Sequence, residues 1–273
     1  EEKQLDKDIV LKRLQPLLAD ENILKIGHNI KYDIKVFDKY KCQVNSFDDT
    51  MLMSHCINGG QQRHSLDSVA KYLLNHETIK LKDLIGSGKK ELNFMNVPIN
   101  LAADYAAEDA DMTFQVWKIL KKELVKKSVY SVYQNIDRPM ISVLIDAELK
   151  GIEVDKLQLQ RLSEFFDKKL SELESKIFTT VGVKFNIGSP KQLGEILFEK
   201  LKLPGGKKNK SGGFQTGADI LEDLSSKGFE ITSYLLEWRK ISKLKSTYSD
   251  SLMLHVNNFT GRVHSSFNLA GTS

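Results

Sequence analysis

The sequence predicts an α/β domain followed by a mainly helical region, and three observations support this prediction. Helix-like and strand-like patterns alternate over residues 5–57, which indicates a parallel sheet with covering helices. The first short apolar strand pattern ends at Gly27 and passes directly into a helix pattern. The second half of the chain instead shows long amphipathic patterns rich in Lys and Glu. We therefore expect two regions, residues 1–127 and residues 128–273.

The first region is expected to alternate helices with short strands. Its helices have apolar residues three and four positions apart, whereas its strands are short apolar runs. We expect helices at residues 5–18, 29–40 and 50–57, and strands at residues 23–26 and 44–47. Glycine-containing loops at residues 58–60 and 86–90 follow, and a further helix begins near residue 100.

The second region is expected to consist mostly of helices. Amphipathic patterns cover residues 130–149, 156–178 and 234–254, and another helix begins near residue 218. Gly151 lies in the break between the first two patterns. A loop rich in Gly and Lys at residues 204–213 supplies Lys207, Lys208 and Lys210, which suit either a solvated loop or contact with a phosphate backbone.

Composition narrows the class of protein. With 273 residues, of which 41% are hydrophobic, the chain is long enough to bury a core. No apolar run approaches roughly 18 residues and no signal peptide precedes the polar start, so we expect a soluble protein. Cys42 and Cys56 do not indicate a disulfide framework or a zinc site, which fits a reducing cytoplasm. The formal charge of +4 suits a nucleic-acid binder only if its cations are grouped.

Tyr105 and Asp109 carry the clearest chemical signal. They lie one helical turn apart, so a phenol and a carboxylate project from the same face and can hold one water or ion. Asp33 follows the strand pattern that ends at Gly27, at the rim where α/β sheets place their sites. Two carboxylates on separate elements indicate a shared divalent metal ion.

Several motifs resemble those of the bacterial family A DNA polymerases of the DNA polymerase I type. Residues 27–33 (Gly-His-Asn-Ile-Lys-Tyr-Asp) and 105–111 (Tyr-Ala-Ala-Glu-Asp-Ala-Asp) resemble two motifs of their proofreading exonuclease. Residues 63–68 resemble a segment between those motifs. Residues 188–200 and 236–248 are similar to the base and the long helix of the polymerase thumb. These motifs follow the family's order, and the resemblance extends over nearly the whole chain.

The resemblance implies a ribonuclease H-like 3′–5′ exonuclease domain that lacks its first strands, followed by the polymerase thumb and the beginning of the palm. It also implies removal of mispaired 3′ ends with two divalent metal ions, Mg²⁺ or Mn²⁺. In the family's arrangement, Asp109 binds the first ion, Asp33 holds the second through water, and Tyr105 orients the attacking water. Positions that hold the terminal nucleotides are matched by Asn29, Tyr32, Arg63 and Leu81.

On the thumb, the resemblance implies contacts with the DNA backbone by Arg239, Lys243 and Lys245. Arg239 and Lys243 share a helix face and Lys245 lies well round the helix, which suits either phosphate contact or solvation. The expected partner is therefore DNA, as a single-stranded 3′ end at the exonuclease site and as primer–template duplex at the thumb. We expect a monomer in the bacterial cytoplasm, associated with the nucleoid, and no membrane partner.

The chain departs from the family in one respect that concerns activity. Family exonucleases open with an Asp-x-Glu strand whose carboxylates bridge both ions, and no such strand precedes Asp33. The catalytic palm carboxylates are also outside the chain, which we therefore interpret as an internal fragment of a polymerase. We expect this fragment to be inactive alone, and the strand at residues 23–26 to expose an apolar edge that favours aggregation.

Structural interpretations stay open for several of these residues. Asn29 and Asp33 also suit a helix start, as a cap and an early acid. Arg63 suits a surface ion pair as well as a phosphate, whereas His28 and His64 lack metal-ligand spacing and are expected to be hydrogen bonded. For the whole chain, the alternative functions are an RNase D-type 3′–5′ exoribonuclease and a non-catalytic exonuclease-like scaffold that binds DNA.

Overall fold

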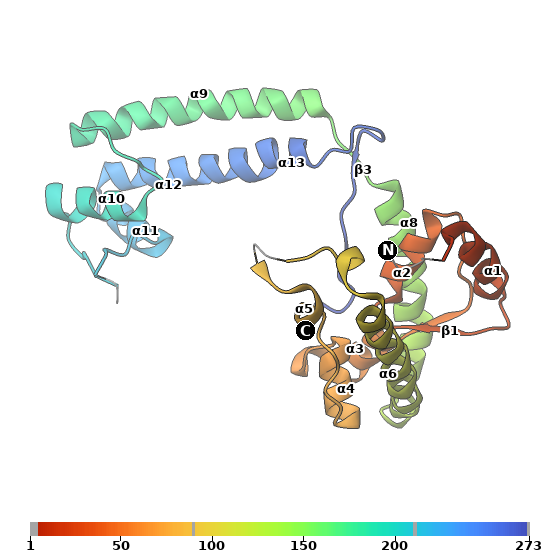
Figure 1. Cartoon of the computed structure of the whole chain (residues 1–273). Coiled ribbons are helices and arrows are strands. Elements are labelled where there is room, and N and C mark those ends of the chain that lie inside the picture. Colours follow the sequence, from red (N-terminus) through yellow and green to blue (C-terminus); the bar gives the residue numbers. More distant parts are fainter. Residues whose placement is uncertain (1–4, 89–90, 210–211, 272–273) are drawn as a thin grey trace. The chain divides into compact units, whose positions relative to one another are not determined.

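The computed structural model describes residues 5–88, 91–209 and 212–271, which form two compact units (Figure 1). Unit 1 contains the chain up to Lys150 together with a returning segment that begins at Ser265, and unit 2 contains Gly151–His264. The predicted boundary between residues 127 and 128 lies inside unit 1, and it stays a prediction.

The N-terminal part of unit 1 alternates helices with two short strands, which confirms the predicted α/β class. In chain order it contains α1 (Lys7–Ala19), β1 (Lys25–Gly27), α2 (Ile30–Asp38), β2 (Phe47–Asp49) and α3 (Thr50–Asn58). The two strands pair in parallel, with Ile26 opposite Asp48. Strand β2 begins at Phe47 instead of residue 44, because Ser46 has a φ of 53° and turns the chain out of the extended conformation.

The sheet has an open edge within the described ranges. Strand β1 pairs with β2 on one side, and no other described strand pairs with it. Beside β1 lies a pocket of about 220 Å³, whose apolar lining comes from Leu18, Ile26, Ile30, Ile34, Phe37 and Val44. Apolar surface next to β1 is therefore present, and its effect on aggregation stays a prediction.

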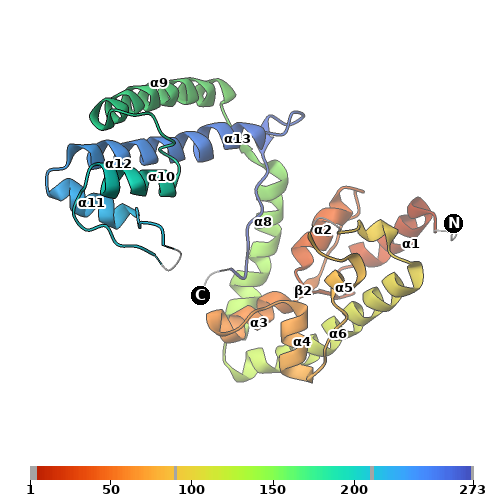
Figure 2. The same ribbon diagram turned by 60° about the vertical axis from the view of Figure 1, so that its left-hand side comes forward.

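Further helices, of which α6 and α8 are long, complete unit 1 (Figure 2). After η1 (Gly59–Gln61) come α4 (Leu66–Leu74), α5 (Leu81–Ile85), η3 (Phe94–Asn96) and α6 (Ile99–Lys126). A helical stretch follows, made of α7 (Tyr130–Val132), the π-helix η4 (Tyr133–Asp137) and α8 (Arg138–Lys150). Helix α6 packs against α3 and α4, and buried Leu52, Val69, Val116 and Leu120 fill the space between them. This core fixes the long helix that carries Tyr105 and Asp109.

Unit 2 is built on two helical stretches that run side by side in opposite directions (Figures 1 and 2). Helix α9 (Lys156–Val181) lies along α12 (Glu230–Lys243), the π-helix η6 (Leu244–Asp250) and α13 (Ser251–Leu254). One end of the pair carries α10 (Pro190–Gly194), the π-helix η5 (Glu195–Lys200) and α11 (Ala218–Ser226). The mainly helical character predicted for the second region is confirmed.

Unit 2 also contains a small antiparallel sheet that the sequence did not predict. Strand β3 (Ile152–Glu153) pairs with β4 (Arg262–Val263), and the Arg262 guanidinium donates a hydrogen bond to the Gly151 carbonyl at 3.1 Å. Two-residue strands are too short to leave a periodic pattern. None of the helices in the described ranges combines the length and apolar content that a membrane span requires.

Candidate functional site

Helix α6 presents Tyr105 and Asp109 one turn apart, and each side chain affects the pKa of the other. Hydrogen bonding between the Tyr105 hydroxyl and the Asp109 carboxylate affects the pKa of both groups. Burial and this hydrogen bond raise the pKa of Tyr105 to about 12, so the phenol stays protonated at neutral pH. Burial also raises the pKa of Asp109, against the opposing effect of the hydrogen bond. The pair is therefore a neutral phenol bound to a partly buried carboxyl group.

A second carboxylate, that of Asp67, lies near this pair. Its negative charge acts to raise the pKa of both Tyr105 and Asp109. Asp67 is in the first turn of α4, and its Oδ1 accepts a hydrogen bond from the Thr78 hydroxyl at 2.9 Å. Asp67 was not among the residues predicted from the sequence, and its place in the motif at residues 63–68 was the available signal.

A buried carboxylate fixes the start of α2. Asp49 is fully buried at the end of β2, and it accepts hydrogen bonds from the backbone N–H groups of Asn29 at 3.2 Å and Ile30 at 2.9 Å. The same carboxylate accepts from Met51 and Leu52 at the start of α3. One side chain thus caps two helices, and it sets the position of the turn that carries Asn29. The sequence analysis did not predict a role for Asp49 in the site.

Glycine and asparagine are needed in this turn for geometric reasons. A Cβ atom on Gly27 would lie 2.7 Å from Cγ1 of Ile30, which is closer than a packed side chain allows. Asn29 has a φ of 62°, a left-handed conformation that Asn adopts more readily than most residues. The Asn29 side chain makes no capping hydrogen bond, so the helix-cap interpretation holds for its position but not for its amide.

Asp33 lies on α2 and lines the apolar pocket beside β1. Burial of its carboxyl group raises its pKa, although its own backbone N–H acts in the opposite direction. Within the described residues, no hydrogen bond or ion pair joins Asp33 to Tyr105 or Asp109. The structure therefore brings Tyr105 and Asp109 together but does not join Asp33 to them.

The predicted divalent ions can be tested against the side chains present. Carboxylate oxygens are the ligands that Mg²⁺ and Mn²⁺ prefer, so the chemistry of Asp33 and Asp109 is suitable. Two carboxylates are too few to form a metal site by themselves. The described part of the chain contains no group of three or more His, Cys, Asp or Glu side chains that could hold a metal ion. The described residues alone do not complete a metal site.

The four residues predicted to hold nucleotides are all at the surface. Asn29 and Tyr32 line a pocket of about 310 Å³ together with the segment at residues 266–269, and Tyr32 is 67% exposed. Leu81, at the start of α5, is 42% exposed. Arg63 is exposed and forms no ion pair with any residue that the structure describes. Each of these side chains is accessible to a ligand, and their roles stay predictions.

His28 and His64 are hydrogen bonded, as predicted. The His28 ring is within 2.8 Å of the Thr50 hydroxyl and 2.9 Å of the His64 carbonyl. Burial is the main cause that lowers the pKa of His28, to about 4, so its ring is neutral near pH 7. The His64 ring contacts Ser54 Oγ at 2.9 Å and the Gly59 carbonyl at 2.7 Å. Both histidines therefore support the loop structure around the site.

The three cations predicted on the thumb differ in their surroundings. The Arg239 guanidinium donates to the Thr216 carbonyl at 2.5 Å and is half buried, which lowers its pKa. Lys245 pairs with Asp250 at 2.7 Å and with Asp167 at 3.4 Å. Lys243 is exposed and, among the described residues, has no ion-pair partner. Of the three, Lys243 is the one whose charge is open to an added phosphate.

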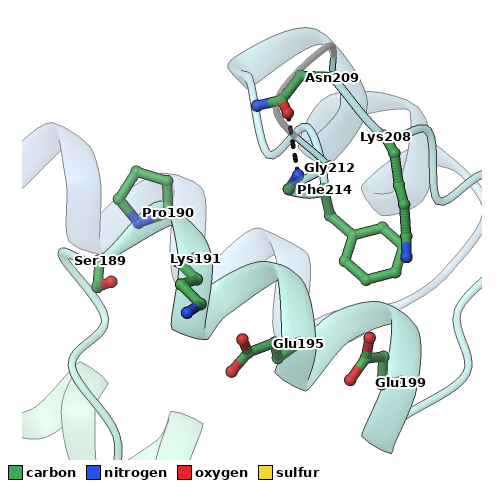
Figure 3. A pocket seen from close by; sticks show the side chains of 10 residues that line it. Ser189, Pro190, Lys191, Glu195, Glu199, Lys208, Asn209, Gly212 and Phe214 are labelled. Atoms are coloured by element: carbon green, nitrogen blue, oxygen red, sulfur yellow. Dashed lines mark hydrogen bonds between the residues drawn. The ribbon is translucent and has the colours of Figure 1, made fainter.

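The described part of the Gly- and Lys-rich loop at residues 204–213 lies beside a pocket of about 620 Å³ in unit 2 (Figure 3). The Lys208 ammonium lies 4.9 Å from the centre of the Phe214 ring, and Glu195 and Glu199 line the same pocket from η5. This surface carries both signs of charge, so it is not a purely basic groove. Lys210 lies outside the described residues. Contact between this loop and phosphates stays a prediction.

Comparison with known proteins assigns the two parts of the chain separately. Residues 2–125 match the family model described as 3′–5′ exonuclease, and residues 156–273 match the model described as DNA polymerase family A. The chain is 45% identical over 263 residues to DNA polymerase I of Rhizobium leguminosarum, covering 96% of this chain and 26% of that protein. It is 39% identical over 271 residues to DNA polymerase I of Pseudomonas aeruginosa, covering 98% and 30%.

A solved structure has a similar fold. It is the polymerase domain of Pol1 from M. smegmatis in complex with DNA primer-template and dNTP, with a TM-score of 0.77 and 26% sequence identity. The match covers 98% of this chain and 43% of that one. This chain spans less than a third of the length of the two curated relatives named above.

Proposed function

Because the chain belongs to DNA polymerase family A, with a 3′–5′ exonuclease region ahead of its polymerase region, we propose that it is part of a DNA polymerase I. In this proposal the whole enzyme carries out DNA-templated synthesis in replication and repair, and the exonuclease region removes mispaired 3′ ends. The proposed partners are a single-stranded 3′ end at the exonuclease site and primer–template duplex at the thumb. We also propose that the enzyme acts as a monomer in the cytoplasm, at the bacterial nucleoid.

The observation that carries the exonuclease proposal is the placement of Tyr105 and Asp109 one turn apart on α6, where each affects the pKa of the other. A protonated phenol held by a carboxylate is suited to orient a water molecule toward a phosphodiester. Asn29, Tyr32, Arg63 and Leu81 are exposed or line a pocket, where they can hold the last nucleotides. The chemical step would then depend on how accurately α2 and α6 place these side chains.

Two divalent ions, Mg²⁺ or Mn²⁺, belong to the proposal. Asp109 and Asp33 would each contribute a carboxylate, and ions held in this way neutralise charge that develops on a phosphate during hydrolysis. Since the described residues hold no complete set of ligands, further carboxylates must come from outside them. As the family resemblance implies, we expect the 273-residue chain alone to be inactive in cleavage.

The test is 3′ trimming of a labelled single-stranded DNA with Mg²⁺ or Mn²⁺. This chain is compared with one extended upstream to include any Asp-x-Glu strand. Trimming only by the extended chain supports the proposal, and trimming by the 273-residue chain contradicts the expected inactivity. Asp109→Asn in the extended chain serves as the control for a contaminating nuclease.

A second candidate function is a non-catalytic exonuclease-like scaffold. It is favoured by the lack of a complete metal-binding group among the described residues. Inactivity of both chains in the trimming assay, together with DNA binding, would support it. The RNase D-type alternative is not favoured, because residues 156–273 match the polymerase family.

A further inference from the structure

Helix α8 carries a buried carboxylate that joins three parts of unit 1. The Glu148 side chain is 0% exposed, and it accepts a hydrogen bond from the Lys31 ammonium and another from the Lys35 ammonium at 2.5 Å. It also accepts from the backbone N–H of Phe267 at 2.7 Å. Lys31 in turn donates to the Phe267 carbonyl. One ionic group thus connects α8, α2 and the segment at residues 265–271.

The helix held by this group is the one that carries predicted site residues. Lys31 and Lys35 lie one turn apart on α2, so both anchor the same face of the helix to Glu148. Tyr32 and Asp33 lie on the same helix but outside this anchored face, and Asn29 is its N-cap. Rotation of α2 about its axis would break the contacts with Glu148 and would move Tyr32 and Asp33 at the same time.

Buried charge makes this connection specific. Lys31 is 6% exposed and Glu148 is 2% exposed as whole residues, so neither can exchange its partner for water without a large loss of free energy. The Phe267 backbone has both its N–H and its carbonyl bound within the same group. The segment at residues 265–271 follows β4 directly in the chain, and it is fixed to α2 at this point.

We propose that Glu148 is a positioning residue of the exonuclease site, because its carboxylate fixes the orientation of α2 and anchors the segment at residues 265–271 to that helix. The proposal rests on the proposed exonuclease function. The Glu148 carboxylate is buried away from any ligand, and it acts through Lys31 and Lys35 on the placement of Asn29, Tyr32 and Asp33. A misplacement of about 1 Å at a reacting centre can lower a rate on the order of 100-fold.

The experiment uses Glu148→Gln in the longest natural chain that contains these 273 residues. Asp146→Asn is the matched control, since Asp146 is on the same helix but exposed. Hydrogen exchange is measured at residues 29–33 and 265–271, and single-strand 3′ trimming is measured as kcat and KM. For Glu148→Gln we expect faster exchange in both segments and a fall of roughly ten-fold or more in kcat. Asp146→Asn is expected to change neither.

A second variant separates a loss of positioning from a loss of stability. Lys31→Met combined with Glu148→Met replaces the buried ion pair by apolar side chains, which often preserves stability. We expect this double variant to recover the melting temperature but to keep the fast exchange at residues 265–271 and the lower kcat. Recovery of kcat together with the melting temperature would show a merely structural role and overturn the proposal.

The remaining outcomes separate this inference from the proposed function. A wild-type chain without trimming activity contradicts the proposed function. An active wild-type chain whose kcat is unchanged by Glu148→Gln overturns the positioning role alone. Faster exchange at residues 265–271 without any change at residues 29–33 would also overturn it, because α2 would then not depend on Glu148.

Discussion

The interiors of units 1 and 2 differ in their buried polar side chains. In unit 1 the buried residues include the charged side chains of Lys31, Asp48, Asp49 and Glu148. In the described part of unit 2 the buried polar residues are Thr216, Thr232 and Ser249, none of which carries a charge. Both units also contain an apolar cluster, which in unit 2 includes Leu193, Leu197, Leu221 and Leu235. Buried charged groups therefore help to fix unit 1, whereas the described interior of unit 2 relies on apolar and uncharged polar side chains.

The difference corresponds to what each unit is proposed to do. A buried charge is tolerated only when its partners are in place, so it fixes the elements that it joins in one geometry. Asp48, for example, accepts hydrogen bonds from Trp117 at 2.8 Å and Tyr133 at 3.0 Å, which ties β2 to α6 and η4. Accurate placement of this kind suits a reaction site, whereas surface cations on an apolar frame suit contact with any DNA sequence.

The largest expected effect is on the chemistry of unit 1. Asp109→Asn, in the longest natural chain that contains these residues, should lower 3′ trimming by roughly 100- to 1,000-fold, because a ligand for a catalytic ion contributes several kcal/mol. Asp111→Asn, on the exposed side of the same helix, is the control and should leave trimming unchanged. Unchanged trimming by Asp109→Asn would contradict a catalytic site in unit 1.

The next largest effect is expected on the stability of unit 1. Asp49→Ala leaves four backbone N–H groups without their buried acceptor, and we expect the free energy of unfolding to fall by about 3 kcal/mol. Asp6→Ala removes an exposed cap of α1 and should cost about 1 kcal/mol. Urea unfolding followed by circular dichroism measures both. Equal losses of unfolding free energy in the two variants would contradict a stabilising contribution from the burial of Asp49.

The pH dependence of unit 1 should depend on Glu148. Burial acts to raise the pKa of Glu148, but the hydrogen bonds from Lys31 and Lys35 outweigh it and hold the pKa at about 2 instead of 4.5. A carboxyl group with a lowered pKa stabilises the fold above its unfolded pKa and loses this contribution as the pH falls. The difference in unfolding free energy between wild type and Glu148→Gln should therefore shrink between about pH 4.5 and pH 2. A constant difference would contradict this assignment.

The smallest effect is expected on the surface of unit 2. Lys243→Gln should reduce the slope of log affinity for primer–template against log salt by about 0.9, since one phosphate contact is lost. Lys245→Gln should change the slope less, because Asp250 and Asp167 already pair with this lysine. Fluorescence anisotropy over a salt series measures both slopes and that of the double variant. An unchanged slope in the double variant would mean that both lysines are only solvated.

Local features of the fold and site were predictable from the sequence. The helices around residues 130–149, 156–178 and 234–254 follow from apolar spacing over several turns. The interaction between Tyr105 and Asp109 follows from a separation of one helical turn. These features depend on residues that are close in the sequence, so a pattern along the chain contains all the information that they need.

Features formed by distant residues were not predictable in this way. Glu148 lies 117 residues from Lys31, and Tyr133 lies 85 residues from Asp48. No spacing rule connects such pairs, and the acids look like ordinary surface carboxylates in the sequence. The pairing of β3 with β4 was missed for the same reason, since its partners are more than a hundred residues apart and each strand has two residues.

Arg239 and Lys243 illustrate which properties of a side chain follow from the sequence and which depend on the tertiary structure. By itself the sequence determined that both are cations on one face of α12, because helical periodicity sets the face. Only the tertiary structure decided that Arg239 is bound to Thr216 while Lys243 faces solvent. Burial and pairing depend on which distant segments pack against a side chain, and those contacts form only when the chain has folded.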